Sequence, residues 1–162
     1  MNQPEQLALH HALAVCVTHR EALEDALADL RLRNLTADDL RSLSKGDRRL
    51  LDQFAYRYTR LQDDLGARLM PAVLRALQED VGPMSVRDRL DRLEQLGWLP
   101  SAEAWLALRR MRNAFTHDYP LSVAEQMASL LAAMTAAYQL LAVLAGFEAR
   151  SGREFPGLHA VD

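Results

Sequence analysis

The chain has 162 residues, of which 49% are hydrophobic and 25% charged, a composition typical of one soluble globular domain with a buried core. The formal net charge of -3 excludes a protein that is basic throughout, so any contact with nucleic acid must depend on local positive charge. The single cysteine, Cys16, excludes an intrachain disulfide and suits the reducing cytoplasm, where we expect the protein to act.

No segment of the sequence predicts a membrane protein. The first residues, MNQPEQLALHH, lack the basic region and the apolar core of a signal peptide. The longest apolar run, in the last predicted helix, is interrupted by Thr135 and Gln139 and falls short of the ~20 residues of a membrane span. We therefore expect no membrane contact.

The first predicted helix ends at Asn34 and carries an apolar stripe on one side. That stripe consists of Leu9, Leu13, Val17, Leu23, Leu27 and Leu30. Thr36 then begins a capping-type sequence, T-A-D-D, which predicts a short helical turn.

A long second helix is predicted to begin at Asp47, a good N-cap residue after Gly46. Its apolar residues recur at steps of three and four, the spacing of one helix face. They are Leu51, Phe54, Tyr58, Leu61, Leu65, Leu69, Val73 and Leu77. Pro71 has no backbone N–H and should kink or split this helix.

Three further helices are predicted from their capping residues. Ser85 with Asp88 caps a third helix, Ser101 a fourth, and Ser122 with Glu125 a fifth. The apolar stripe of the third helix is Val86, Leu90 and Leu93, and that of the fourth is Trp105, Leu108, Met111 and Phe115. The fifth carries Met127, Leu130, Met134, Tyr138, Leu141 and Leu144 and is predicted to end at or just past Gly146.

Five helices with short connections and no alternating strands predict an all-α, up-and-down type helical bundle. We expect a single domain over residues 1–150 and an irregular tail over 151–162. The fifth helix is alanine-rich and apolar over more than one face, so either it lies centrally in the bundle or a second subunit covers it. We favour a homodimer.

The stretch RMRNAFTHDY, residues 110–119, gathers polar side chains at the end of the fourth helix. At about 100° per residue, these side chains lie on an arc separate from the apolar stripe. The arc consists of Arg109, Arg112, Asn113, Thr116 and His117. Arg112 borders the apolar stripe, so its stem can be covered while its guanidinium reaches out.

This group of side chains permits chemistry on a phosphate. A guanidinium suits a phosphate and the charge that develops on it, and a histidine can take a proton from a 2′-hydroxyl or give one to a 5′-oxygen. Such residues also satisfy the carbonyl groups at an ordinary helix end and favour the helix dipole. From composition alone, the ordinary helix end is the better interpretation.

The motif R-x4-H-x-Y, formed by Arg112, His117 and Tyr119, resembles the signature of HepT-like toxins in the HEPN superfamily. Asn113 matches the polar residue that often follows the arginine. The motif's place, at the end of the fourth helix and before a long closing helix, also resembles the HEPN bundle over roughly residues 5 to 148. The chain differs in being longer than the compact toxins, in having Pro71, and in not being basic.

This resemblance implies a metal-independent endoribonuclease that acts as a homodimer on RNA, with Arg112 and His117 as the catalytic residues. Asn113, Tyr119, Arg109 and Thr116 would contribute to binding. It also implies a toxin-antitoxin pair, in which a nucleotidyltransferase-type antitoxin can attach AMP to the motif tyrosine, here Tyr119. The alternative is a non-catalytic HEPN-like binding partner of a minimal nucleotidyltransferase. A helical dimer without any nucleic-acid role is a third reading.

Other candidate residues favour structural roles. His10, His11, Cys16 and His19 in the first helix lack a second pair of ligands at a suitable spacing, so we expect a buried thiol, exposed imidazoles and no metal site. The sequence contains no glycine-rich phosphate loop, so we expect no cofactor.

Further arginines and tryptophans have simple interpretations. The four arginines of the second helix alternate with acids and predict a salt-bridged surface. They are Arg57, Arg60, Arg68 and Arg75. Arg110 adds charge beside Arg112 that could contact RNA, or it is a solvated surface residue. Trp98 and Trp105 are expected to be core anchors.

Overall fold

The computed structural model describes the backbone of residues 3–114 and 122–159, and these residues form helices and connecting turns without a strand. The predicted all-α bundle is therefore confirmed for this part of the chain. The elements, in chain order, are α1 (Gln3–Arg33), α2 (Ala37–Arg41), α3 (Lys45–Asp64), the π-helical turn η1 (Leu65–Leu69), α4 (Met70–Ala76), α5 (Val86–Gln95), α6 (Ala102–Ala114), α7 (Val123–Glu154) and the 3-10 turn η2 (Pro156–His159).

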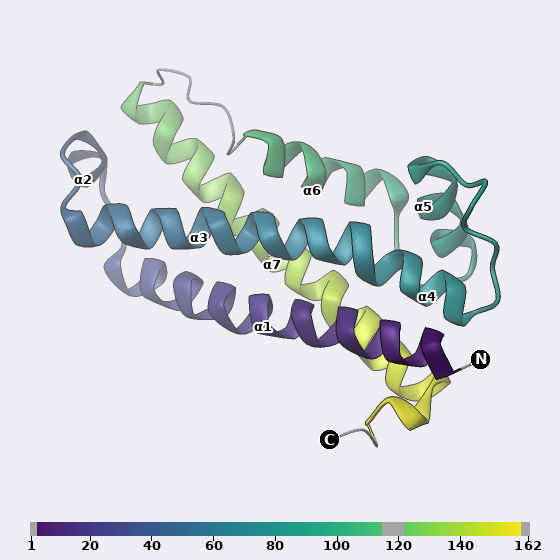
Figure 1. Ribbon diagram of the computed structural model, residues 1–162. Helices are drawn as coiled ribbons and strands as arrows, with labels where there is room; N and C mark the ends of the chain where they lie inside the picture. Colours follow the sequence, from purple (N-terminus) through teal and green to yellow (C-terminus); the bar gives the residue numbers. More distant parts are fainter. Residues whose placement is uncertain (1–2, 115–121, 160–162) are drawn as a thin grey trace.

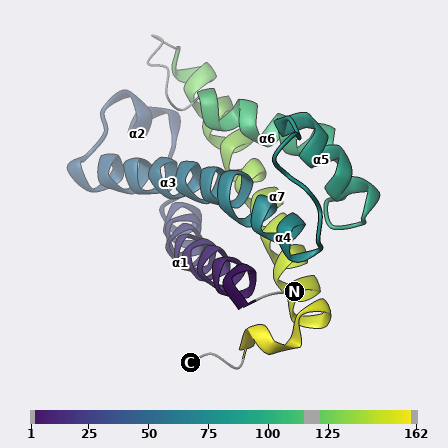
Figure 2. The same cartoon turned by 45° about the vertical axis from the view of Figure 1, so that its right-hand side comes forward.

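The long helices α1 and α3 lie side by side and run in opposite directions, and they make the most extensive contact in the bundle (Figure 1). α5 and α6 return along the α3–α4 side, while α7 crosses behind and contacts α1, α2 and α6 (Figure 2). The core lies between these helices. Its largest fully buried side chains are Tyr58, Phe54, Phe147, Leu9, Leu23, Leu27, Leu61, Leu65, Leu69, Met70, Leu74 and Leu93.

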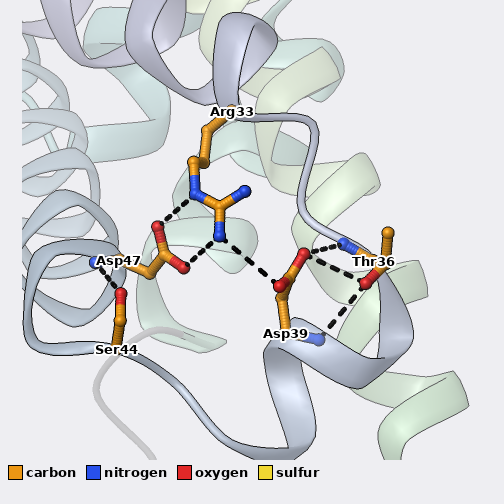
Figure 3. Close-up of polar contacts among 5 residues, drawn as sticks. All are labelled: Arg33, Thr36, Asp39, Ser44 and Asp47. Carbon is orange, nitrogen blue, oxygen red and sulfur yellow. Dashed lines mark hydrogen bonds and ion pairs between the residues drawn. The ribbon is translucent and has the colours of Figure 1, made fainter.

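The turns from α1 through α2 to α3 are held by a polar network. Arg33, at the end of α1, donates to both carboxylate oxygens of Asp47 at 2.8 and 2.9 Å and to Asp39 at 3.4 Å (Figure 3). Thr36 and Asp39 form the predicted capping box of α2. The N-cap of α3 is Ser44 rather than Asp47, because the Ser44 hydroxyl accepts from the Asp47 backbone N–H. The prediction of Asp47 as the cap was therefore wrong by one helical turn.

The helix is not split in two at Pro71, but the predicted kink has a counterpart, because a π-helical turn interrupts the α-helix before the proline and α4 bends away from the direction of α3 (Figure 1). A π-helical turn, Leu65–Leu69, lies immediately before the proline, and the Met70 N–H donates to the Leu65 carbonyl. Pro71 occupies the first turn of α4, where a missing N–H is tolerated. The α3–η1–α4 stripe is buried as predicted, from Phe54 to Val73.

Helix α7 differs from its prediction in length and in part of its buried face. Its fully buried side chains are Ala133, Ala136, Ala137, Leu140, Leu144, Phe147 and Ser151, of which the predicted stripe contained only Leu144. Three other residues of that stripe, Leu130, Met134 and Leu141, are partly buried against the core. Tyr138 is exposed instead. The helix also runs past Gly146 to Glu154, so the first residues of the tail that was expected to be irregular are helical. An apolar surface on every side of a helix leaves the buried side undetermined by periodicity.

By length and composition, α7 is apolar enough to span a membrane, which the sequence pattern did not predict. About 33% of its most apolar window is buried inside the bundle, and the core helix of a soluble protein can meet the same criterion.

Candidate functional site

Helix α6 is anchored by its buried face and presents its arginines on the other. Ser101 caps its first turn through the Ala104 N–H, and Trp105 and Leu108 are buried as predicted. The Tyr58 hydroxyl of α3 donates to the Leu108 carbonyl at 3.0 Å, which fixes α6 against α3. Burial raises the pKa of this phenol, so it stays protonated and remains a donor.

Arg112, the predicted catalytic arginine, is held in place by Asp63 in the last turn of α3. Its Nε donates to Asp63 Oδ1 at 3.1 Å and its Nη2 to Oδ2 at 3.0 Å, the bidentate arrangement of a guanidinium on a carboxylate. The side chains of Arg112 and Asp63 are 29% and 37% exposed, so the pair sits at the protein surface and stays accessible to a ligand.

A pocket of about 490 Å³ opens beside this pair, between α3, η1, α5 and α6. Its lining residues are Gln62, Asp63, Gly66, Ala67, Met70, Val86, Arg89, Leu90, Trp105, Arg109 and Arg112. Val86, which the sequence assigned to the buried stripe of its helix, is exposed here and lines the pocket. The pocket thus combines an apolar lining with three arginines and one carboxylate.

The π-helical turn and its glycine shape one wall of this pocket. A Cβ atom at Gly66 would lie 2.9 Å from Cζ2 of Trp105, so only glycine allows η1 to approach the indole this closely. π-helical turns inside α-helices occur frequently at functional sites. In the sequence, the π-helical turn is marked only by Gly66 within it and by Pro71 shortly after it.

Of the predicted site residues, the structure brings Arg109 and Arg112 together at one pocket. Asn113 lies in the last turn of α6, but its side chain is outside the described residues. Thr116, His117 and Tyr119 also lie outside the described residues. Asp63 was missed as a site residue because its partner lies 49 positions away, and only its adjacency to Asp64 marked it in the sequence.

A second polar cluster joins α1 to the end of α3 in the interior. His19 Nε2 lies 2.9 Å from Asp64 Oδ2, and Arg57 Nη1 lies 3.1 Å from His19 Nδ1. A guanidinium can only donate, so Nδ1 accepts and the imidazole proton sits on Nε2. Hence Asp63 and Asp64, adjacent on α3, contact helices on different sides, α6 and α1 respectively.

His19 in this cluster is buried, not exposed as the sequence predicted, because its ring satisfies the buried Asp64 carboxylate. Cys16 is buried as predicted, and burial, with Asp64 nearby, raises the pKa of its thiol to about 12. Within the described part of the chain, no three His, Cys, Asp or Glu side chains are placed to hold a metal ion.

Comparison of the chain with family models, with curated proteins and with solved structures finds no match. The motif and the pocket beside Arg112 are therefore the features of this chain that indicate a function.

Proposed function

We propose that the protein is a cytoplasmic, metal-independent endoribonuclease and the toxin of a toxin-antitoxin pair. The observation that carries this proposal is the position of Arg112, which is held by Asp63 at the rim of a pocket that also contains Arg89 and Arg109. Three arginines and one aspartate give this pocket a positive balance although the whole chain has a net charge of -3. Such local positive charge is what binding of an RNA phosphate requires.

In the proposed reaction, the 2′-oxygen of a ribose attacks the adjacent phosphorus and the bond from phosphorus to the 5′-oxygen breaks. Arg112 stabilises the negative charge that develops on the phosphate oxygens. His117 accepts the proton of the 2′-hydroxyl or donates a proton to the departing 5′-oxygen. The products are a 2′,3′-cyclic phosphate and a 5′-hydroxyl end. Because one histidine cannot easily serve as base and acid at once, two copies of the pair across a dimer axis would complete the site.

The apolar surface of α7 supports the proposed homodimer. Leu131 and Tyr138 are 58% and 44% exposed, and only 33% of the helix's most apolar window is buried. Exposed apolar patches of this kind often mark protein interfaces. Sedimentation velocity should find a dimer, and Leu131→Glu should dissociate it. Leu7→Glu is the control, because Leu7 on α1 is comparably exposed, and this variant should remain a dimer. A monomeric wild-type protein would contradict the dimer.

A cleavage assay tests the catalytic proposal. RNA is incubated in EDTA with the wild type, Arg112→Ala, His117→Ala and the control Arg48→Ala, an exposed arginine on α3. Loss of the acid or base should lower the rate by about 10²–10⁴-fold, and Arg48→Ala should cleave like the wild type. Circular dichroism establishes that each variant is folded. Equal cleavage by all four proteins, or cleavage by none, refutes the catalytic assignment.

One observation favours the alternative of a non-catalytic binding partner of a minimal nucleotidyltransferase. The Asp63 carboxylate occupies two donors of Arg112 and so competes with a phosphate for this guanidinium. For this alternative, the protein is expected to co-purify with such an enzyme and to show no cleavage of RNA.

For the toxin, the partner is a nucleotidyltransferase-type antitoxin, and Tyr119 is the candidate for modification by AMP. Mass spectrometry of Tyr119 after incubation with that enzyme and ATP tests this point.

A further inference from the structure

The pocket between η1, α5 and α6 contains polar groups that the bundle itself leaves unsatisfied. Gln62 is only 3% exposed and lines the pocket, and its side-chain amide, which is not among the fully buried unpaired atoms, has no hydrogen bond to another described residue and is open to a ligand in the pocket. The Nε atom of Arg89 is buried and likewise has no hydrogen-bond partner among the described residues. Buried polar groups in folded proteins are nearly always paired, so unpaired ones in a pocket indicate a bound ligand.

The charges around the pocket specify an anionic ligand. Arg112 is neutralised by Asp63, whereas Arg89 and Arg109 form no ion pair with any described residue. Two guanidiniums, from α5 and α6, therefore face one cavity without a carboxylate partner in this part of the chain. A phosphate group, with several acceptor oxygens and a negative charge, fits this pair of donors.

The remaining lining specifies what the phosphate is attached to. Gly66, Ala67, Met70 and the indole of Trp105 give the pocket an apolar wall on the side of η1 and α6. The Gln62 amide offers both a donor and an acceptor, which suits the edge of a nucleobase. The volume of about 490 Å³ lies within the range of roughly 300–1,000 Å³ of small-molecule pockets.

We propose that this pocket binds one nucleoside phosphate unit, with its phosphate on Arg89 and Arg109 and its base against the apolar wall and Gln62. The proposal rests on the proposed function in one respect, which is that the unit belongs to the RNA strand next to the scissile phosphate at Arg112. Arg109 and Arg112 are three residues apart on α6 and hence neighbours on one helix face. Contact with two successive phosphates of one strand is consistent with this spacing.

Isothermal titration calorimetry with adenosine 5′-monophosphate tests the pocket directly. Arg89→Gln and Arg109→Gln should each weaken binding about tenfold, as expected for loss of one charge-assisted contact. Arg110→Gln is the matched control, because Arg110 is exposed and adjacent to Arg109 but does not line the pocket, and its affinity should stay within about twofold of the wild type. Ala67→Phe, at an exposed position on η1, should fill the pocket and abolish binding.

Two further probes separate a nucleotide site from a simple anion site. Inorganic phosphate and adenosine should each bind more weakly than the monophosphate, because each lacks half of the contacts. A fully 2′-O-methylated RNA oligonucleotide, which cannot be cleaved through its 2′-oxygens, should compete with the monophosphate and distinguishes an RNA unit from a free nucleotide. The proposal is overturned if inorganic phosphate binds as tightly as the monophosphate, if the oligonucleotide does not compete, or if Ala67→Phe and Arg89→Gln leave affinity unchanged. Thermal unfolding checks that each variant is folded.

Failure of this inference is distinguishable from failure of the proposed function. If the monophosphate binds in an Arg89-dependent way but His117→Ala cleaves RNA like the wild type, the catalytic proposal fails and the pocket assignment stands. If cleavage depends on Arg112 and His117 but the monophosphate does not bind, the pocket assignment alone fails. If both hold, Arg89→Gln should raise KM for RNA with little change in kcat.

Discussion

Substitution of Gly66 by alanine tests whether the contact between η1 and Trp105 resists added volume. A new Cβ atom would lie 2.9 Å from Trp105 Cζ2, and the indole is only 2% exposed, so it has little room to move. Overpacking of this kind costs about 1–3 kcal/mol. The better helix propensity of alanine offsets about 1 kcal/mol. We therefore expect Gly66→Ala to lower the free energy of unfolding by about 1 kcal/mol.

Gly146→Ala is the matched control, because Gly146 also lies inside a helix but has open space around its Cβ position. It should raise the free energy of unfolding by up to about 1 kcal/mol. Since the propensity gain is common to both substitutions, the difference between the two variants isolates the Trp105 contact at about 1–3 kcal/mol.

The assay is urea unfolding followed by circular dichroism, at two protein concentrations so that any contribution of dimerisation is detected. If Gly66→Ala gains as much stability as Gly146→Ala, the indole moves without cost and our account of this wall of the pocket is refuted.

Four further substitutions have expected outcomes that follow from the core and the turns. Tyr58→Phe removes the hydroxyl that donates to the Leu108 carbonyl and should cost about 1 kcal/mol in urea unfolding; no change would mean that this bond does not help to fix α6. Phe147→Ala empties a fully buried site and should cost about 3–5 kcal/mol, and a cost below 1 kcal/mol would contradict its burial. Gly97→Ala places a side chain at φ 76° and should cost about 1 kcal/mol by thermal unfolding, whereas a gain would contradict the left-handed backbone there. Burial raises the pKa of the Cys16 thiol from 9.0 to about 12, so between pH 9.0 and about 12 the thiol ionises in the unfolded chain but not in the folded one. The free energy of unfolding should therefore fall by up to about 1.4 kcal/mol per pH unit in this range, and Cys16→Ala should remove this contribution. Equal slopes of the free energy of unfolding against pH for both proteins would count against it.

The starts of several helices were predictable because a cap is a local interaction. The boxes at Thr36 and Ser85 each join a hydroxyl to an N–H three residues later, and both form as the sequence indicates. The start of α3 was misplaced because Ser44 and Asp47 are both good caps within one turn, and local pattern cannot rank them. The stripe of α3 was predictable because its polar residues leave only one apolar face.

The candidate site was predictable only in part. The sequence placed Arg109 and Arg112 on one side of their helix, away from its apolar stripe, which follows from helical periodicity alone. It did not indicate Asp63, Gln62 or Arg89, because these residues come from other helices and are brought to Arg112 by packing.

What the sequence by itself determined is therefore the all-α class, the approximate positions of the long helices, most of their capping residues and the side of α6 that carries the arginines, since each depends on residues within one or two turns. Only the tertiary structure decided which side of α7 is buried, that Asp63 pairs with Arg112 while Asp64 pairs with His19, and that a pocket opens at η1. The reason is physical. An apolar helix such as α7 has several equivalent faces, and two adjacent carboxylates have the same local chemistry. Their different partners are selected by the packing of α1, α3 and α6 around one core.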